Sequence, residues 1–192
     1  VWGDAERSRV FTLLRATARP GGISVVSGSQ PPGVPVDFPA QLAASMPESR
    51  VVLDTSGATL TEAVRRPIPG LDVLRMDSEE GEALAGHPLQ KPEDTADFAQ
   101  SLVRAGVART VIVARGADGN VLATAEHRLH ARSAKVRVKS TVGAGDSFVA
   151  GFVLALARGG DVAAAMAMGS AAASAAVMSD ATELCDAAEV PR

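Results

Sequence analysis

The sequence predicts an α/β fold in which a mostly parallel β-sheet is covered by helices on both faces. Short runs rich in Val, Ile and Leu alternate with helical patterns along the 192 residues. The runs are continuously apolar, as in strands that are buried on both faces. Each run ends in small or polar residues, which mark the end of a strand. Because no internal repeat or low-complexity tract interrupts this pattern, we expect a single domain over residues 1–192.

Three elements open the predicted fold. Residues 4–18 place apolar side chains along one side of a helix. ISVVSGS (23–29) is a β-branched run closed by small residues, and it predicts a buried strand that ends in a loop. The stretch PPGVP separates this strand from a helical pattern over residues 37–46.

The middle of the chain repeats the alternation of strand and helix. RVVLDTSG (50–57) is an apolar strand followed by an acid and small residues, and a helix follows near residues 59–66. LDVLRMD (71–77) predicts a third strand. SEEGEALAG (78–86) predicts a short helix, which Gly86 ends because glycine adopts the left-handed conformation of a helix C-terminus.

The last part of the chain predicts a further helix, three strands and two long helices. The helix covers residues 95–105, and RTVIVARGADGN (109–120) is a fourth strand with a glycine-rich exit. VLATA (121–125) and the stretch around KVRVK (135–139) predict short, more exposed strands. The long helices are expected over residues 145–157 and 162–177.

The composition excludes several classes of protein. Apolar residues make up 46% and charged residues 21%, which is typical of a globular chain. The net charge is −3 and the basic residues are scattered, which argues against a nucleic-acid partner. The single cysteine, Cys185, forms no internal disulfide and predicts a reducing, cytoplasmic location. The uncharged run over residues 162–179 is too weakly apolar for a membrane span, so we expect no membrane partner.

The strand exits share one character, because each carries small or polar residues. They read SGS, DTSG, RMDSEE, ARGADG and STVGAGD in chain order. Ligands of open α/β sheets bind outside the carboxyl ends of the strands. We therefore expect these stretches to lie along one edge of the sheet.

The stretch GAGD joins a glycine turn to the start of a helix. Gly143, Ala144 and Gly145 let the backbone approach a ligand, and the helix start adds partial positive charge. Such a nest suits an anion, and Asp146 could accept a proton from a substrate hydroxyl. Together they fit phosphoryl or acyl transfer. The four residues alone fit an ordinary helix start equally well.

The triplet GDS (145–147) also resembles the GDS-type esterases, in which Ser147 would be the nucleophile. That mechanism needs a histidine base. The chain contains only His87, His127 and His130, and none lies downstream of the triplet. We therefore keep this hypothesis as the weakest of the alternatives.

Two carboxylates follow the third strand at helical spacing. Asp77 and Glu80 are three residues apart, so both can face one ligand, and such a pair suits Mg²⁺ held mainly through water. A capping box at the start of the next helix would use the same two residues. Asp54 is a third acid at this edge. The glycines of ARGADG (114–119) would let the backbone lie against a ring or a phosphate, although a hairpin turn explains them as well.

Taken together, these stretches resemble the PfkB, or ribokinase-like, carbohydrate kinases, above all the phosphofructokinase branch. VVSGSQPPGVP, VVLDTSG, RMDSEE, VIVARGADG, STVGAGDSFVAGF and GSAAASAAVMSDATELC occur in the order of that family. The resemblance implies a ribokinase-like, Rossmann-like sheet. It also implies transfer of the γ-phosphoryl group of Mg·ATP to a hydroxyl of fructose-6-phosphate, fructose-1-phosphate or tagatose-6-phosphate.

The resemblance implies a role for each motif. Asp146 corresponds to the base that contacts the sugar hydroxyl, and the backbone of Gly143, Ala144 and Gly145 corresponds to the anion hole. Asp77 and Glu80 match the family's Asn-x-x-Glu, which organises Mg²⁺ and phosphate. The other correspondences are nucleotide contacts by Arg75, Asp77, Ala114, Arg115, Gly116, Ala117, Asp118, Gly119 and Ser174, a sugar contact by Ser29, and a monovalent-cation (K⁺) loop of Ser140, Val142, Ala176, Ser179, Ala181 and Glu183.

The chain departs from the family pattern at several of these positions. Arg75-Met76-Asp77 stands where the family has Lys-Pro-Asn, and the extra carboxylate lies beside the phosphates. Arg115 and Gln30 each replace a usual Leu, and Ala181 replaces a usual Gly. The family's N-terminal portion, with its glycine-rich sugar-binding motif and β-sheet lid, has no counterpart here. We expect a partial catalytic domain whose full-length form dimerises through that lid. A non-catalytic nucleotide-binding remnant is the alternative.

Overall fold

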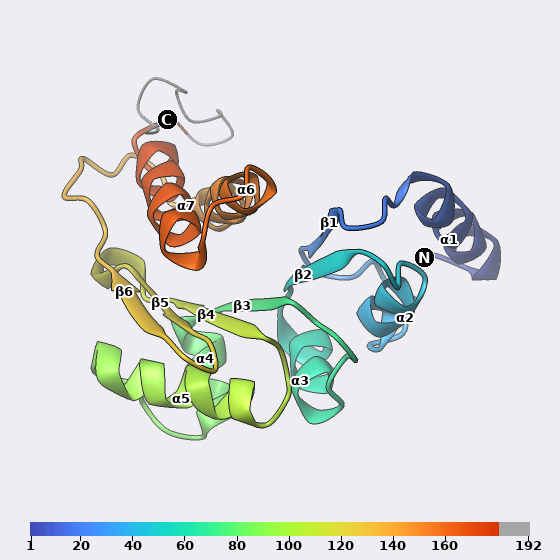
Figure 1. The fold of residues 1–192 in the computed structure, drawn as a ribbon, viewed down its shortest axis with the longest axis horizontal. Coiled ribbons are helices and arrows are strands. Elements are labelled where there is room, and N and C mark those ends of the chain that lie inside the picture. The colour runs from blue at the N-terminus through green and yellow to red at the C-terminus, as the bar shows by residue number, and fades with distance from the viewer. Residues whose placement is uncertain (181–192) are drawn as a thin grey trace.

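The computed structural model describes residues 1–180 and contains a six-stranded sheet between two helical layers (Figure 1). The strand order is β1-β2-β3-β4-β5-β6, so each strand pairs with its neighbour in the chain. β1 to β4 are parallel, and β5 and β6 are antiparallel additions. The strands are β1 Ile23–Ser27, β2 Arg50–Asp54, β3 Val73–Asp77, β4 Thr110–Ala114, β5 Asn120–Ala123 and β6 Arg128–Ala131.

The helices divide between the two faces of the sheet. α6 and α7 cover one face, and α3, α4 and α5 cover the other, with α1 and α2 at the β1 end (Figure 1). The helices that connect the parallel strands β1 to β4 lie on one face, as expected for successive crossovers of the same hand, whereas α6 and α7 follow β6 in the chain and cover the other face. The helices are α1 Asp4–Thr17, α2 Phe38–Ala44, α3 Gly57–Arg65, α4 Ser78–Ala85, α5 Pro92–Arg104, α6 Ala144–Ala157 and α7 Val162–Ala176, with a 3₁₀ turn, η1, over Gly116–Asp118.

The alternation of side chains along each strand gives the sheet two hydrophobic cores. Val51 and Leu53 of β2 pack among residues of α2, α3 and α5, whereas Val52 packs with Phe148 and Phe152 of α6. All of these side chains are buried. The two cores confirm the predicted parallel sheet that is covered on both faces. They also explain the continuous apolar strands, since each face of such a strand packs against apolar side chains.

Two predictions for the region after β4 were wrong. Residues 135–139 form no strand; the partner of β5 is β6 instead, with Ala123 opposite Arg128. The Thr124 hydroxyl accepts the N–H groups of Glu126 and His127, which closes a tight turn and starts the return strand early. β5 is also buried along its whole length rather than exposed, because α5 and α7 flank it.

Within residues 1–180, none of the helices combines the length and the apolar character that a membrane crossing requires. Most of the alanine-rich run over residues 162–179 forms α7, Val162–Ala176, which packs tightly on α6. Gly151 of α6 and Gly169 of α7 meet at this contact. A Cβ on Gly151 would lie 3.1 Å from the Cα of Gly169, so glycine is what lets the two helices approach.

Candidate active site

The ends of three neighbouring strands place three polar residues side by side on the face that α6 covers. Ser27 pairs in register with Asp54, and Asp54 pairs with Arg75. Asp54 and Arg75 follow Val52 and Val73 by two residues, and these valines belong to the core beneath α6. Ser27 follows Ile23 by four residues, and Ile23 packs against the same core. Side chains two apart on a strand share a face. The three residues therefore form a polar row directly beyond that core.

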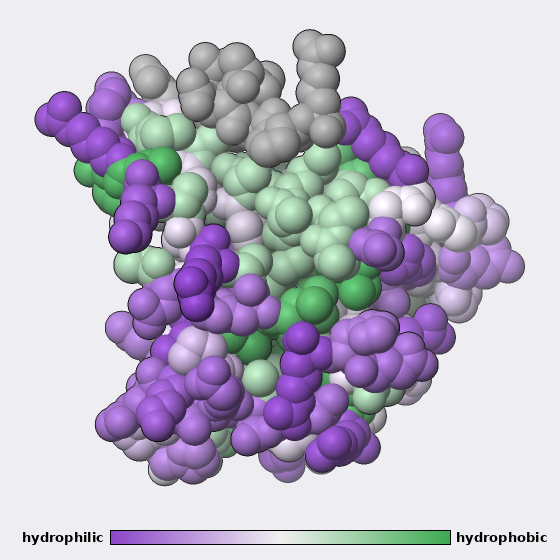
Figure 2. All heavy atoms as spheres, turned by 60° about the vertical axis from the view of Figure 1, so that its left-hand side comes forward, coloured by the Kyte–Doolittle hydropathy of each residue, from purple (hydrophilic) through white to green (hydrophobic). Residues whose placement is uncertain are grey.

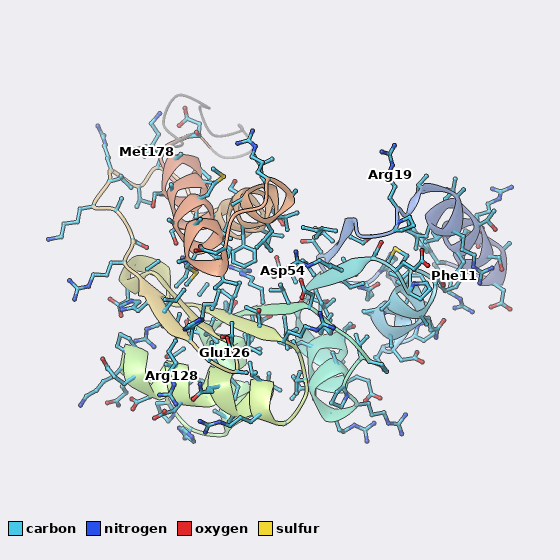
Figure 3. The ribbon with its side chains drawn as sticks, viewed as in Figure 1. Phe11, Arg19, Asp54, Glu126, Arg128 and Met178 are labelled. Carbon is cyan, nitrogen blue, oxygen red and sulfur yellow. The ribbon has the colours of Figure 1, made fainter. Side chains whose placement is uncertain are left out.

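Arg75 is held inside this row by an ion pair with Asp54. Its Nη1 atom lies 3.0 Å from Oδ1 of Asp54, and both side chains are largely buried. Figure 3 places Asp54 between the sheet and α6. The guanidinium also lies against the first turn of α6, where a Cβ on Gly145 would be 3.0 Å from Nη1. A fixed positive charge therefore sits directly under the predicted anion nest.

The start of α6 brings the predicted base over the same row. Gly143 precedes the helix with a φ of 78°, a left-handed conformation that glycine adopts without strain. Asp146 lies in the first turn, is exposed, and accepts a hydrogen bond of 3.3 Å from the Ser27 hydroxyl. The GAGD residues and the strand exits therefore meet, although Ser27 and Asp146 are 119 residues apart.

The loops after β1 and β2 are tied together beside Asp146. The N–H of Gly28 donates to the carbonyl oxygen of Asp54 at 2.9 Å, and the Thr55 hydroxyl donates to the carbonyl oxygen of Gly28 at 3.1 Å. Ser29, the predicted sugar contact, lies 3.2 Å from the hydroxyl of Ser56. Ser29 is therefore at the sheet edge that carries Asp146, as expected.

Asp77 and Glu80 form the capping box of α4. The N–H of Glu80 donates to Oδ1 of Asp77, and the N–H of Asp77 donates to Oε2 of Glu80, both at 2.9 Å. Burial raises the pKa of Glu80 above its ordinary value, and the negative charges of Asp77 and Asp54 add to that rise. The hydrogen bond from the Asp77 backbone and the charge of Arg75 act in the opposite direction.

The same two carboxylates fit the expected magnesium ion. The capping box uses one oxygen of each, which leaves the other oxygen for a metal-bound water. Residues 1–180 contain no group of three or more His, Cys, Asp and Glu side chains arranged to hold a metal. Two carboxylates that each keep a free oxygen are compatible with Mg²⁺, which keeps several waters and shares its coordination with phosphates.

The turn between β4 and β5 contains the predicted nucleotide loop. Gly116 and Gly119 have φ values of 57° and 99°, and the N–H of Gly119 donates to the carbonyl oxygen of Gly116. Ala114 shares the α6 face with Ile112, whereas Arg115 follows Val111 and Val113 to the α4–α5 face. The Arg115 guanidinium therefore points to the layer opposite Asp146. A direct nucleotide contact through its side chain does not fit this geometry, and a contact through the backbone of residues 114–119 stays a prediction.

The helix α7 borders this turn. Asn120 donates a buried hydrogen bond of 3.3 Å to the Ser170 hydroxyl, which joins β5 to α7. One turn further along, the hydroxyl of Ser174 donates to the carbonyl oxygen of Ser170. The exposed side chains of α7 include Ala163, Ala164 and Ala167. Figure 2 shows a pale green area of small apolar side chains where α6 and α7 lie, next to hydrophilic residues.

The structure brings together two of the segments predicted to bind a monovalent cation. The N–H groups of Lys139 and Ser140 donate to the carbonyl oxygen of Val177, at 2.8 and 3.3 Å. Ser140 and Val142 therefore lie beside the end of α7, where Ala176 and Ser179 are located. Ala181, Glu183 and Cys185 lie outside the described residues.

The three histidines have partners away from Ser147. His130 bonds to the carbonyl oxygen of Asp118, His87 to that of Pro88, and His127 lies 4.0 Å from Glu126. The structure therefore supplies no support for the histidine base that the esterase hypothesis requires.

Two features of the site were not predicted from the sequence. Ser27 was not identified as a partner of Asp146, and Asp54 was seen only as one more acid at the edge. Strand register could have revealed both, because Ser27, Asp54 and Arg75 occupy equivalent positions at the ends of consecutive parallel strands. The hydrogen bond and the ion pair themselves depend on side-chain geometry that periodicity does not contain.

Known proteins resemble this chain in sequence and in structure. The model of the pfkB family of carbohydrate kinases matches residues 4–188. The ATP-dependent 6-phosphofructokinase isozyme 2 of Escherichia coli is 35% identical over 86% of this chain and 53% of its own length. The 1-phosphofructokinase of Xanthomonas campestris is 36% identical over 80% of this chain and 49% of its own length.

Crystal structures extend the likeness to the whole described fold. The E. coli phosphofructokinase-2 in complex with substrates and products superposes with a TM-score of 0.89 and 31% identity. Its complex with potassium superposes with a TM-score of 0.89 and 30% identity. Each comparison covers 98% of this chain and 61% of the other. The chain spans about half the length of the curated relatives it matches, and on this evidence it belongs to the pfkB family of carbohydrate kinases.

Proposed function

We propose that the protein containing this chain transfers the γ-phosphoryl group of ATP to a hydroxyl of a phosphorylated sugar. The observation that carries this proposal is the arrangement around Asp146. Its exposed carboxylate stands on the first turn of α6, beside a glycine turn, with the Arg75 guanidinium packed beneath Gly145. A base, an anion nest and a fixed cation within one helical turn are the parts that phosphoryl transfer needs.

The proposed reaction uses these residues in one step. The Asp146 carboxylate accepts the proton of the sugar hydroxyl while the hydroxyl oxygen forms its bond to the γ-phosphorus and the bond to ADP breaks. The N–H groups of Gly143 and Gly145 and the guanidinium of Arg75 would face the charge on the moving phosphoryl group, whereas the N–H of Ala144 donates to the carbonyl oxygen of Thr141 at 3.3 Å. The Ser27 hydroxyl, 3.3 Å from Asp146, orients the carboxylate.

Two cations complete the proposal. Asp77 and Glu80 would hold Mg²⁺ through water, and the ion would neutralise the phosphates of ATP. The segments around Ser140 and Ala176 would form the K⁺ loop, supported by their proximity here and by the potassium complex of the E. coli relative. The names of the relatives favour fructose phosphates as acceptors. We also propose a single catalytic domain, a cytoplasmic location, and a homodimer of the full-length protein.

The substitution Asp146→Asn tests this function in the full-length protein. Removal of the base should lower kcat by about 10²–10⁴-fold and leave the Kd for Mg·ATP nearly unchanged. Ser147→Ala is the control, because it alters the neighbouring residue and should retain activity. Undiminished turnover of Asp146→Asn would overturn the proposal, and ester hydrolysis that depends on Ser147 would revive the esterase hypothesis.

A second candidate function is nucleotide binding without catalysis. It is favoured by Asp77, because its carboxylate would add a negative charge beside the phosphates where the family pattern has Asn. Calorimetry with Mg·ATP on the 192-residue chain, followed by an assay of ADP release with added sugar phosphate, distinguishes the two. Binding without sugar-dependent ADP release supports the second candidate for this chain.

A further inference from the structure

Arg115 is a buried cation that links the turn after β4 to the opposite helical layer. Its side chain is only 7% exposed. Nη1 donates to the carbonyl oxygen of Leu89 at 2.7 Å and to the hydroxyl of Thr95 at 2.5 Å, and Nη2 donates to the carbonyl oxygen of Gln90 at 2.8 Å. The carboxylate of Asp118 lies 3.5 Å away. One guanidinium therefore holds the turn against the segment that joins α4 to α5.

Packing alone does not require a charge at this position. Nε of Arg115 is buried and has no hydrogen-bond partner among the described residues, and three of the four partners of the guanidinium are neutral. A buried charge loses its hydration, and an apolar side chain of similar volume fills such a space without that cost. The planar guanidinium adds directed hydrogen bonds, which fix the position of the backbone that carries it.

The anchored turn consists of residues that are flexible by themselves. Gly116 and Gly119 adopt positive φ values, and glycine loses more conformational entropy on ordering than any other residue. Two side chains hold the turn from its own layer: His130 bonds to the carbonyl oxygen of Asp118 at 2.7 Å, and the Ser133 hydroxyl donates to that of Gly116 at 3.0 Å. Arg115 connects the turn to the helical layer on the other side of the sheet, through its bonds to the α4–α5 segment and α5.

We propose that Arg115 is a positioning residue, which preorganises the turn over residues 116–119 for a nucleotide through its bonds to the α4–α5 segment. The inference rests on the proposed function, in which this turn contacts the nucleotide. A loop that is ordered before binding avoids an entropic cost when the ligand arrives. Nucleotide affinity should therefore depend on a side chain that points away from the nucleotide.

The test compares Arg115→Met and Arg115→Lys with a control, Arg128→Met, in the 192-residue chain. Arg128 also makes close bonds, to Gln100 at 2.6 and 2.9 Å and to Asp97 at 2.6 Å, but it lies against α5 (Figure 3). Arg115→Met should raise the Kd for Mg·ATP by about tenfold, as expected for a loop that must order on binding. It should also accelerate amide hydrogen exchange at Asp118 and Gly119 without nucleotide. Arg128→Met should lower Tm without either effect, and Arg115→Lys should recover part of both.

Each outcome decides a separate part of the inference. Unchanged exchange in Arg115→Met would overturn the anchor, and faster exchange with an unchanged Kd would overturn its role in nucleotide binding. If the unaltered chain binds no Mg·ATP, the proposed function of the turn fails, whereas the exchange result still decides the anchor. Thr95→Val removes one acceptor only, so it gives the same comparison with smaller expected changes if Arg115→Met fails to fold.

Discussion

The guanidinium of Arg75 lies so close to Gly145 that a Cβ there would stand 3.0 Å from Nη1, 3.1 Å from Nη2 and 3.3 Å from Cζ. Arg75 cannot simply yield, because its Nη1 is paired with the buried Asp54. Gly145 at the start of α6 therefore leaves the space that the Arg75 guanidinium occupies. This contact explains why residue 145 is glycine although its backbone has an ordinary helical conformation.

Gly145→Ala should displace the Arg75 side chain and leave the fold intact. If the full-length protein has the proposed kinase activity, its kcat/KM should fall by about 10²-fold, because displacing a catalytic group by about 1 Å has an effect of that size. The double variant Gly145→Ala with Arg75→Lys should recover activity, since the slimmer ammonium leaves room for the methyl group. Steady-state kinetics of the three proteins test this, and full activity of Gly145→Ala alone would contradict it.

Asp54→Asn should release Arg75 from its ionic partner. We expect the free energy of unfolding to fall by about 1.5–3 kcal/mol, the range for hydrogen bonds that involve charged groups, and KM for ATP to rise. Asp72→Asn is a matched control, because Asp72 is similarly buried and accepts a bond of 2.8 Å from Arg50 where β2 begins. Urea unfolding should show a loss in both variants. A rise of KM in both, or in neither, would argue against a specific role of Asp54.

Gly151→Ala should destabilise the contact between α6 and α7. The new Cβ would lie 2.9 Å from the carbonyl oxygen of Met168 and 3.0 Å from the Cβ of Ala172. Overpacking of this kind costs about 1–3 kcal/mol. Gly81→Ala is the control in α4, because its Cβ would have ordinary contacts of 3.5–3.6 Å and should stabilise the helix by roughly 0.5–1 kcal/mol. Thermal unfolding should therefore show opposite shifts in Tm, and equal shifts would refute the packing argument.

Glu80→Gln should change how stability depends on pH. The pKa of Glu80 is raised in the folded state from 4.5, mainly by burial, so between 4.5 and the raised value the folded protein binds more protons than the unfolded one. The contribution of the Glu80 carboxyl to the free energy of unfolding is therefore fully present below pH 4.5, and it is lost as the pH rises through the pKa of Glu80 in the folded protein. Glutamine keeps the capping acceptor without the charge, so the variant should lack this loss. Unfolding curves from pH 4 to 8 test it, with Glu79→Gln as the exposed control.

Periodicity was sufficient for the architecture because the buried strands carry unbroken apolar runs. RVVLD and TVIVA each pack on two helical layers, and their short length and β-branched residues distinguish them from a buried helix such as α6. The turn after β5 could not be predicted from periodicity, because the hydrogen bonds of a single hydroxyl, that of Thr124, decide where β6 starts. The stretch KVRVK alternates like a strand but has no partner strand in the described sheet.

The local geometry of the candidate site was predictable wherever it depends on the backbone alone. The glycine turn before α6 and the capping pair Asp77–Glu80 follow from local sequence. The direction of the Arg115 side chain was not predicted, although the alternation of side chains along β4 places it with Val113 on the α4–α5 face. A family motif assigns a position to a loop, whereas the alternation of the preceding strand decides which layer its side chain enters.

The strand order has a consequence for synthesis on the ribosome. Each strand pairs with its predecessor, so the sheet can grow as residues emerge, and β1, β2 and β3 can align Ser27, Asp54 and Arg75 early. Asp146 follows Arg75, the last residue of the row, by 71 residues, which at about 5–20 residues per second corresponds to roughly 4–14 s. During this interval, the nascent chain already contains Ser27, Asp54 and Arg75 but not yet α6. Synthesis of that helix adds Asp146 and covers Val52 and Val73, so a ribosome that stalls between β3 and α6 holds a sheet with one apolar face bare and without Asp146.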